Sequence, residues 1–376
     1  MPNTAAVRDK GTNQMTKLTD ISISRRALLA AGATGAAVLA MPNVLRAQDR
    51  SLKVGAYGGY FKDSFDKNVF PEFTKATGIA VESVAEPTGE AWLVQLQQAA
   101  NAGEAPADVS MISQTSMLKG QATELWAPLD AAKINNIDAL IPTFINKYPD
   151  DRIAGIGAVA WYVTLVSNTD VYKEAPTSWA FLWDPSNADK LGLMALVSNS
   201  FLLEVTAKTF FGGTKALDTE EGILKAFDKL AELKGNVRLW YRDEAQFEQA
   251  LKSGEIPMGQ YYHDVTGLAI ADGFHVRSTF PKEGGILDSG CWALSKASKK
   301  VEEAHLFIDF MSQPSIQALV TRKVGTAPTV KRSLTDLTDA EFAAASSEID
   351  PIIPRYDMQV EKADWLSEKW TELIVG

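Results

Sequence analysis

The chain of 376 residues is 46% hydrophobic and carries a formal net charge of −10. This acidity, without any patch rich in lysine or arginine, argues against a nucleic-acid partner, while the length and the hydrophobic content suit two globular domains. Cys291 is the only cysteine and there are three histidines, so an intramolecular disulfide is excluded and a Cys/His zinc site is disfavoured.

The N-terminal segment has the pattern of an export signal. Ser-Arg-Arg-Ala-Leu-Leu at residues 24–29 leads into an uncharged stretch, residues 27–41, that is too short and too weakly apolar for a membrane-spanning helix. Ala47 then supplies the small residue that a signal peptidase requires. We predict a twin-arginine signal peptide over residues 1–47 and a periplasmic protein; the alternative is a basic tail on a protein that is not exported. Six basic and two acidic side chains lie in this segment, so the remainder carries −14 rather than −10.

The first part of the exported chain alternates between strand and helix patterns. Apolar and alternating runs predict strands at residues 52–57, 79–84 and 108–112. A helix from Phe61 to a stop at Gly78, kinked at Pro71, lies between the first two strands. A second helix, capped by Thr88 and with Trp92 on its apolar face, precedes the third strand.

The same alternation continues to residue 311. Further strands are predicted at 192–197 and 256–262, and a crossing strand includes Trp161 and Tyr162. Further helices are predicted at 201–210, 218–235, 243–253 and 301–311. Strands that alternate with helices predict an α/β fold with a mainly parallel sheet.

Candidate ligand residues follow the ends of the predicted strands. In open α/β sheets, ligands bind beyond the carboxyl ends of the strands. The aromatic, hydroxyl, amide and charged side chains selected from strand ends, from the crossing strand and from the segment after the Gly284-Gly285 bend are Tyr57, Tyr60, Ser113, Thr115, Trp161, Asn199, Tyr241, Arg242, Tyr261, Tyr262, Asp264 and Asp288. Such side chains suit a small polar or cationic molecule held by stacking and hydrogen bonds.

Other candidates have simpler structural interpretations. Asp218 followed by Glu221 is typical of a helix cap, and Ser113 also suits one. The pair Glu82 and Glu86 is predicted to face solvent, and Cys291 is predicted to lie in a buried strand. No nucleophile elbow, zinc-protease motif or phosphate loop is present in the sequence. We therefore predict no catalytic residue and no cofactor.

Several motifs together resemble the periplasmic solute-binding proteins of ABC importers. They are the Tyr-Gly-Gly that ends the first strand, Phe-Pro-Glu-Phe-Thr-Lys-Ala-Thr-Gly at 70–78, Ala-Asp-Val at 107–109, Leu-Trp-Ala-Pro-Leu-Asp at 125–130, Pro-Lys-Glu-Gly-Gly at 281–285 and Gly-Thr-Ala-Pro-Thr at 325–329. The motif Pro-Lys-Glu-Gly-Gly at 281–285 is similar to the corresponding segment of the spermidine/putrescine-binding branch. The resemblance covers essentially the whole exported chain.

This resemblance implies a two-lobed clamshell of the type II periplasmic-binding-protein fold, each lobe a mainly parallel sheet flanked by helices. Lobe one is expected at 51–157 plus 289–330, and lobe two at 158–288 plus 331–376. Closure around the solute is expected, followed by docking of the monomeric protein on a membrane permease. Neither an enzymatic reaction nor a cofactor is implied.

The resemblance leaves the ligand open. Acidic residues of the polyamine branch are replaced here at 198–200, which favours a smaller amine, or a zwitterion held by Asp264 or Asp288 and by Arg242. An alternative is ferric-ion capture, since Tyr261 and Tyr262 also resemble the paired tyrosines of periplasmic iron-binding proteins. A third class, an exported enzyme, lacks a supporting motif.

Overall fold

A computed structural model describes residues 50–87 and 91–375 of the chain. The predicted signal peptide, residues 1–47, and the predicted helix cap at Thr88 lie outside these residues. Within them, no helix combines the length and the apolar character needed to cross a bilayer.

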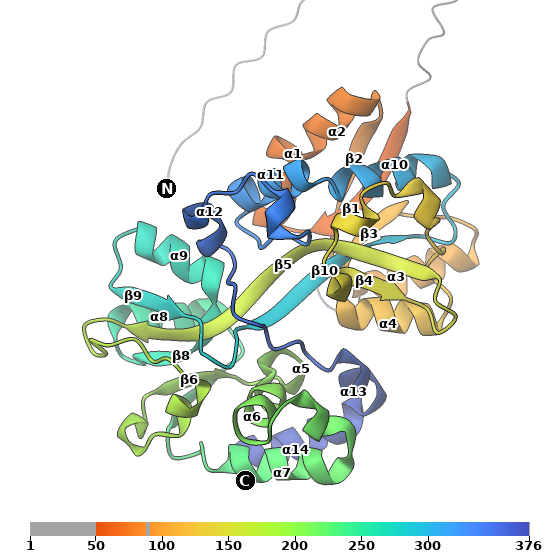
Figure 1. Ribbon diagram of the computed structural model, residues 1–376. Helices are drawn as coiled ribbons and strands as arrows, with labels where there is room; N and C mark the ends of the chain where they lie inside the picture. Colours follow the sequence, from red (N-terminus) through yellow and green to blue (C-terminus); the bar gives the residue numbers. More distant parts are fainter. Residues whose placement is uncertain (1–49, 88–90, 376) are drawn as a thin grey trace, which may run out of the picture. The chain divides into compact units, whose positions relative to one another are not determined.

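A sheet of ten strands organises the fold (Figure 1). Its strand order is β2-β1-β3-β10-β5-β8-β6-β7, and two further strands, β4 and β9, pair with β5 off this path. The strands are β1 Ser51–Tyr57, β2 Ala80–Glu86, β3 Val109–Ser113, β4 Ile145–Lys147, β5 Ile153–Asn168, β6 Leu191–Met194, β7 Val237–Tyr241, β8 Met258–Tyr262, β9 Val276–Thr279 and β10 Ile286–Leu294. This order places β10, which comes late in the chain, between β3 and β5.

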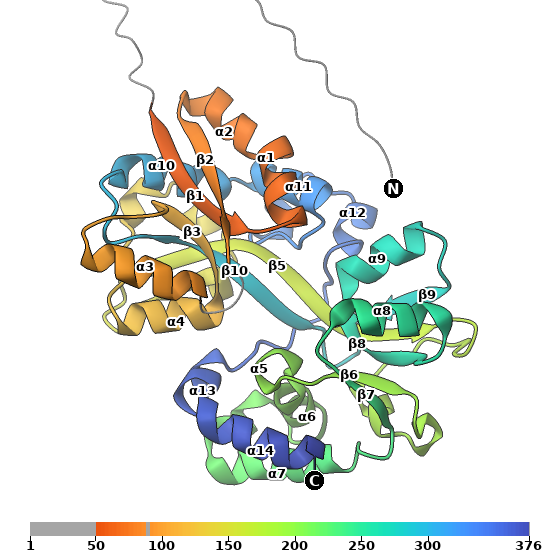
Figure 2. The same ribbon diagram turned by 180° about the vertical axis from the view of Figure 1, so that it is seen from behind.

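The central strands differ from the outer ones in direction. β1 pairs in parallel with β2 and β3, and β6 pairs in parallel with β7 and β8. β5 and β10 are antiparallel to each other and to the neighbours β8 and β3. β5 is 16 residues long, and in Figures 1 and 2 it runs with β10 from one set of parallel strands to the other. The predicted α/β fold is confirmed, with an antiparallel pair that joins its two halves.

Helices cover both faces of each half of the sheet. α1, α2, α10 and α11 pack against one face of the first half, and α3 and α4 against the other. α6, α7 and α14 pack against one face of the second half, and α8 and α9 against the other. The helices are α1 Tyr60–Asn68, α2 Phe70–Thr77, α3 Ala91–Asn101, α4 Gln114–Ala122, α5 Val197–Ser200, α6 Leu202–Phe210, α7 Glu220–Ala231, α8 Glu244–Ser253, α9 His263–Ala271, α10 Val301–Met311, α11 Pro314–Val324, α12 Asp339–Ala343, α13 Tyr356–Glu361 and α14 Ala363–Val375.

Two local predictions are wrong in detail. α1 and α2 replace the single kinked helix, because Val69 ends the first and precedes the second, with Pro71 in the first turn of α2. Thr219, and not Asp218, caps α7, since the threonine hydroxyl accepts a first-turn N–H. Asp218 is instead bonded to the guanidinium of Arg355.

The two main hydrophobic cores draw on different parts of the chain. The first uses residues between 52 and 159 and between 292 and 330. The second uses residues between 163 and 286 and between 352 and 373. Trp292 of β10 lies fully buried in the first core, and its ring makes edge contacts with Phe65 at 6.1 Å and Phe307 at 5.0 Å between centroids. Aromatic burial of this kind is a large part of core stability.

The C-terminal segment returns to the middle of the sheet through α13. Glu204, fully buried in α6, accepts the backbone N–H of Arg355 at 2.9 Å and the side-chain amide of Gln359 at 3.1 Å. α13 also packs against α4, and the two helices lie next to each other in both views (Figures 1 and 2). These contacts fix Tyr356, the first residue of α13, beside the central strands.

The packing around Trp292 generates a stability prediction. Trp292→Ala removes a fully buried ring that contacts two other rings, so we expect the free energy of unfolding to fall by about 3–5 kcal/mol. Chemical denaturation followed by circular dichroism measures the loss. Val94→Ala is the control, because Val94 is 51% exposed and its truncation should cost no more than about 0.5 kcal/mol. Equal losses in the two variants would contradict the assigned core.

Candidate functional site

A partly buried carboxyl group lies on the antiparallel pair. Asp288 of β10 is directly opposite Trp161 of β5. Asp288 Oδ1 accepts the hydroxyl of Tyr356 at 2.7 Å and the backbone N–H of Ser289 at 2.7 Å. Burial raises the pKa of Asp288 to about 6, although these two hydrogen bonds act against the shift. Within the described part of the chain, Asp288 is therefore a carboxyl without a cationic partner, and it is easily charged near neutral pH.

Three tyrosines from different elements lie near this carboxyl, and one of them, Tyr356, is bonded to it. Burial raises the pKa of Tyr57, Tyr262 and Tyr356 well above the usual value, and the charge of Asp288 contributes to each shift. The ring centroid of Tyr57 also lies 6.4 Å from that of Trp161. Neutral aromatic rings around a carboxylate form a site that attracts an organic cation through both the charge and the ring faces.

A second carboxyl group approaches Tyr57 from the neighbouring strand. Glu86 ends β2, opposite Tyr57 in the parallel register. Burial raises the pKa of Glu86 to about 9, against the lowering effects of the Met111 backbone and the Trp92 side chain. The prediction that Glu86 faces solvent is wrong: Glu86 is buried, whereas Glu82 on the same strand is exposed. Residues four apart on a strand share one face, so the difference arises because Glu86, at the end of β2, lies beside Tyr57 of β1 and Trp92 of α3.

Two glycines allow these side chains to approach the sheet. A Cβ atom at Gly55 would lie 2.4 Å from Glu86 Oε1, and one at Gly290 would lie 2.9 Å from the Tyr57 hydroxyl oxygen. Real Cβ atoms do not approach other atoms so closely. Tyr57 Oη and Glu86 Oε1 are both buried and have no hydrogen-bond partner among the described residues. Buried polar atoms of this kind are costly and are retained where a ligand or an ion completes them.

Further acidic groups lie at the end of β8. The Tyr262 hydroxyl donates to Glu244 Oε1 at 3.0 Å, and the Tyr261 hydroxyl donates to the Glu244 carbonyl at 3.4 Å. Asp264 Oδ1 is buried without a partner in the described part of the chain, and burial raises the pKa of Asp264. Among the described residues, no lysine or arginine contributes to the raised pKa values of Glu86, Asp264 and Asp288. The polar residues of this region thus form an acidic and aromatic set.

The structure brings together only some of the predicted ligand residues. Tyr57, Trp161, Tyr262 and Asp288 form the central group, and Tyr261 and Asp264 lie beside it. The remaining predicted residues have other surroundings in this structure: Tyr60 is 58% exposed on α1, Ser113 caps α4 and is bonded to Thr115, Asn199 and Arg242 are exposed, and the buried Tyr241 donates to the Gln260 carbonyl.

Three residues of the site were not among the sequence-based candidates. Glu86 stands at the carboxyl end of a strand, so the rule that selected Tyr57 could also have found it. Glu244 begins α8 and Tyr356 begins α13. No strand-end rule identifies these two, because their positions depend on how the helices pack.

The paired tyrosines do not have the electrostatics of an iron site. A tyrosine binds ferric ion as a phenolate, and neighbouring positive charge favours that form. Burial and the nearby carboxylates Glu244 and Glu248 instead raise the pKa of Tyr261, and burial and Glu244 raise the pKa of Tyr262. Both hydroxyls are also donors to Glu244. These surroundings favour hydroxyl donors that help to bind a cation.

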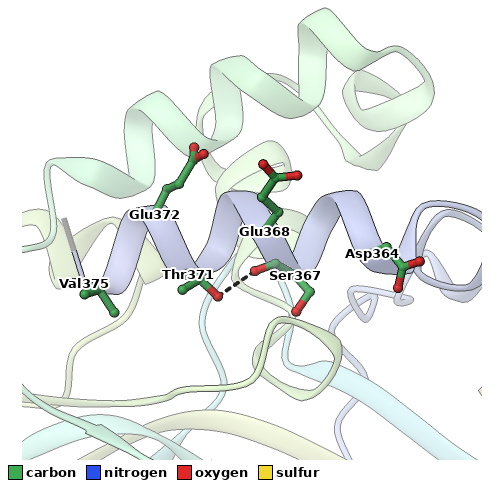
Figure 3. Close-up of a pocket in the computed structure, with 6 residues that line it drawn as sticks. All are labelled: Asp364, Ser367, Glu368, Thr371, Glu372 and Val375. Atoms are coloured by element: carbon green, nitrogen blue, oxygen red, sulfur yellow. Dashed lines mark hydrogen bonds between the residues drawn. The ribbon is translucent and has the colours of Figure 1, made fainter.

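A hollow on α14 lies apart from these residues. Figure 3 shows its lining, which comes from that single helix: Asp364, Ser367, Glu368, Thr371, Glu372 and Val375. The Thr371 hydroxyl donates to the Ser367 carbonyl at 2.8 Å, and Glu372 is paired with Lys369. The hollow is therefore a feature of one helix surface, without polar groups that converge from several elements.

Comparison with known proteins agrees with this chemistry. Residues 68–347 match the family described as bacterial extracellular solute-binding protein. The gamma-aminobutyric acid-binding protein of Pseudomonas aeruginosa is 27% identical over 303 residues, which are 79% of this chain and 82% of that protein. The spermidine/putrescine-binding periplasmic protein of Escherichia coli is 26% identical over 274 residues, covering 72% and 76%.

Solved structures share the fold. An ABC transporter substrate-binding protein from Bradyrhizobium japonicum superposes with a TM-score of 0.72 at 20% identity, over 86% of this chain and 99% of that one. A spermidine/putrescine substrate-binding protein from Streptococcus pneumoniae gives a TM-score of 0.67 at 19% identity, over 86% and 99%. The predicted type II periplasmic-binding-protein fold is confirmed.

The buried acid at Glu86 generates a prediction about stability and pH. The folded carboxyl keeps its proton up to about pH 9, whereas an unfolded glutamate loses it near 4.3. Between these values unfolding releases a proton, so stability falls as the pH rises, by up to about 1.4 kcal/mol per pH unit. We expect Glu86→Gln to match the wild type near pH 4 and to have the higher Tm at pH 8.

Thermal unfolding from pH 4 to pH 8 tests this prediction without any ligand. Glu82→Gln is the matched control, because Glu82 is exposed on the same strand and its change should leave the pH profile unaltered. A Glu86→Gln effect of constant size across the pH range would contradict the assigned protonation.

Proposed function

Since the chain belongs to the bacterial extracellular solute-binding protein family, we propose that it captures a small amine in the periplasm as the substrate-binding component of an ABC importer. Members of this family bind solutes and deliver them to a membrane permease, and they are not enzymes. The observation that carries the amine assignment is the partly buried carboxyl of Asp288, which is bonded to Tyr356, lies opposite Trp161 and near Tyr57 and Tyr262, and has no cationic partner among the described residues. An ammonium group supplies the missing charge and stacks on the rings.

We further propose that the two hydrophobic cores correspond to two lobes, 51–157 plus 289–330 and 158–288 plus 331–376. The division is supported by the chain segments that each core uses and by the pair β5–β10 that connects them. The site lies on this pair, where a small rotation between lobes changes the distance of Tyr57 from Tyr262. The ligand would be enclosed by closure of this kind.

The ligand class within the amines is also a proposal. A polyamine or another small cation fits the acidic set of Glu86, Asp288, Glu244 and Asp264, and relatives bind spermidine and putrescine. The second candidate is a zwitterionic amino compound, since another relative binds gamma-aminobutyric acid. The exposed Arg242 at the end of β7 is the cation that would hold its carboxylate.

The route of export is a separate proposal. The arginine pair at residues 25 and 26, followed by a short uncharged stretch, supports twin-arginine export of the folded protein. We propose that the exported protein is a monomer, as expected for a receptor that must close around its solute and dock on a permease.

The first prediction of this proposal concerns Asp288. Titration calorimetry against putrescine, spermidine, gamma-aminobutyric acid and betaine should identify a ligand, and Asp288→Asn should weaken its binding by at least 30-fold. Loss of a charged partner for a buried cation costs about 2–5 kcal/mol. Asp272→Asn changes an exposed carboxylate after α9 and should leave the affinity unchanged. Binding that survives in Asp288→Asn, or failure of every amine, would contradict the assignment.

The second prediction concerns secretion. Replacing both Arg25 and Arg26 with lysine should abolish periplasmic accumulation, because the twin-arginine route requires the arginine pair. Immunoblots of periplasmic and cytoplasmic fractions measure the distribution of the protein. Arg8→Lys is the control, since it changes a basic residue of the same segment outside the pair. Normal secretion of the double variant would assign the protein to another route.

A further inference from the structure

Glu86 is a buried acid whose role the amine site does not yet explain. The groups that face it come from four elements: Tyr57 on β1, Ser110 and Met111 on β3, Trp92 on α3 and Cys291 on β10. Burial raises the pKa of Cys291 far above the usual value, and the charge of Glu86 adds to that shift. None of these described groups is a cation, and the hydrogen bonds of the Met111 backbone and the Trp92 side chain, which favour the charged form of Glu86, are outweighed by burial.

The geometry links Glu86 to the amine site through Tyr57. The Tyr57 ring reaches from β1 to Gly290 on β10, two residues from Asp288, and the charges of both Glu86 and Asp288 raise the pKa of its hydroxyl. Glu86 Oε1 and Tyr57 Oη are the two buried atoms that lack partners there. A cation bound at Asp288 over the Tyr57 ring would therefore act on Glu86 through Tyr57, the residue whose hydroxyl both carboxyl groups influence.

We propose that Glu86 is a proton-exchanging acid of the amine site: it is neutral in the ligand-free protein and ionises when a ligand cation binds, releasing one proton to solvent. This inference rests on the proposed function. The O–H bond of the carboxylic acid breaks, the proton goes to the buffer, and the electron pair stays on the carboxylate, which then faces the ligand cation. The ligand itself is unchanged, so the step balances without another reactant.

This exchange makes the affinity depend on pH in a defined window. Because binding releases a proton, the affinity rises with pH by up to about tenfold per unit until the free carboxyl itself ionises near pH 9. Asp288 has a pKa of about 6, so its own titration affects the affinity at the acidic end of the range and fades as the pH rises further. Tyr57 and Cys291 titrate above it. His263 has a pKa lowered by burial and titrates below it.

The experiment is titration calorimetry with putrescine as the probe, between pH 6.5 and pH 8.5, in buffers of different ionisation enthalpy. The wild type should release about one proton per putrescine at pH 7.5, and its affinity should rise by about tenfold per pH unit. Glu86→Gln should release none and show a flat affinity. Glu82→Gln, the exposed neighbour on β2, should behave as the wild type.

A ligand-free measurement separates this inference from the proposed function. Titration of the Glu86 carboxyl by infrared difference spectroscopy against Glu86→Gln should show a protonated acid at pH 7. Ionised Glu86 at that pH would overturn the inference whether or not an amine binds. Putrescine binding without proton release, or with equal release in Glu86→Gln, would overturn it while the proposed function stands. If no amine binds and Glu86 is protonated, the proposed function fails, and with it the exchange.

Discussion

The burial of a carboxyl group on the one strand pair that both halves of the sheet share is the constraint on which the site depends. Asp288 cannot leave the pair, because β10 is bonded to β3 on one side and to β5 on the other. Burying a charge without a cation is unfavourable, and the protein partly offsets this with two short hydrogen bonds, from Tyr356 and Ser289. An amine ligand supplies positive charge that further stabilises the ionised form of Asp288.

The hydrogen bond to Asp288 also accounts for the path of the C-terminal segment, which returns to the central strands through α13. Tyr356 reaches Asp288 only because α13 is held by Glu204 in α6 and rests against α4. Glu204 is itself a buried carboxylate, satisfied by the Arg355 backbone and the Gln359 amide. The three acids differ in this respect: Glu204 is bonded to groups of the protein, whereas Asp288 and Glu86 retain capacity for a further partner. Groups that bind a ligand commonly have fewer hydrogen-bond partners within the protein than groups with a structural role.

Much of the fold could be predicted from periodicity, and the site only in part. The strands and helices of both halves follow alternating or 3.6-residue patterns, and the strand-end rule selected Tyr57 and Tyr262, whereas Trp161 was chosen from a crossing strand and Asp288 from the segment after a glycine bend. Glu86 was missed because Ala-Val-Glu-Ser-Val-Ala-Glu is polar enough for a solvated strand, and the groups that bury its end, Trp92 and Tyr57 among them, come from other elements. Arg242 and Asn199 also come after predicted strands, yet their side chains are exposed. A position after a strand does not determine the course of the following loop, and so it does not determine where the side chain points.

Two glycines, Gly55 and Gly290, give the side chains of the site the room that they occupy. Tyr57 can lie over β10 because Gly290 has no Cβ, and Glu86 can lie over β1 because Gly55 has none. Alanine at either position would push one group away while leaving every charged residue in place. The electrostatics of the site therefore depend on two glycines that carry no charge. Both Glu86 and Asp288 affect the hydroxyl of Tyr57, and the absence of a Cβ at Gly55 and Gly290 leaves the room for this arrangement. Uptake of a cation and loss of a proton are coupled through that ring, so the protonation of Glu86 and the occupancy of Asp288 belong to a single equilibrium.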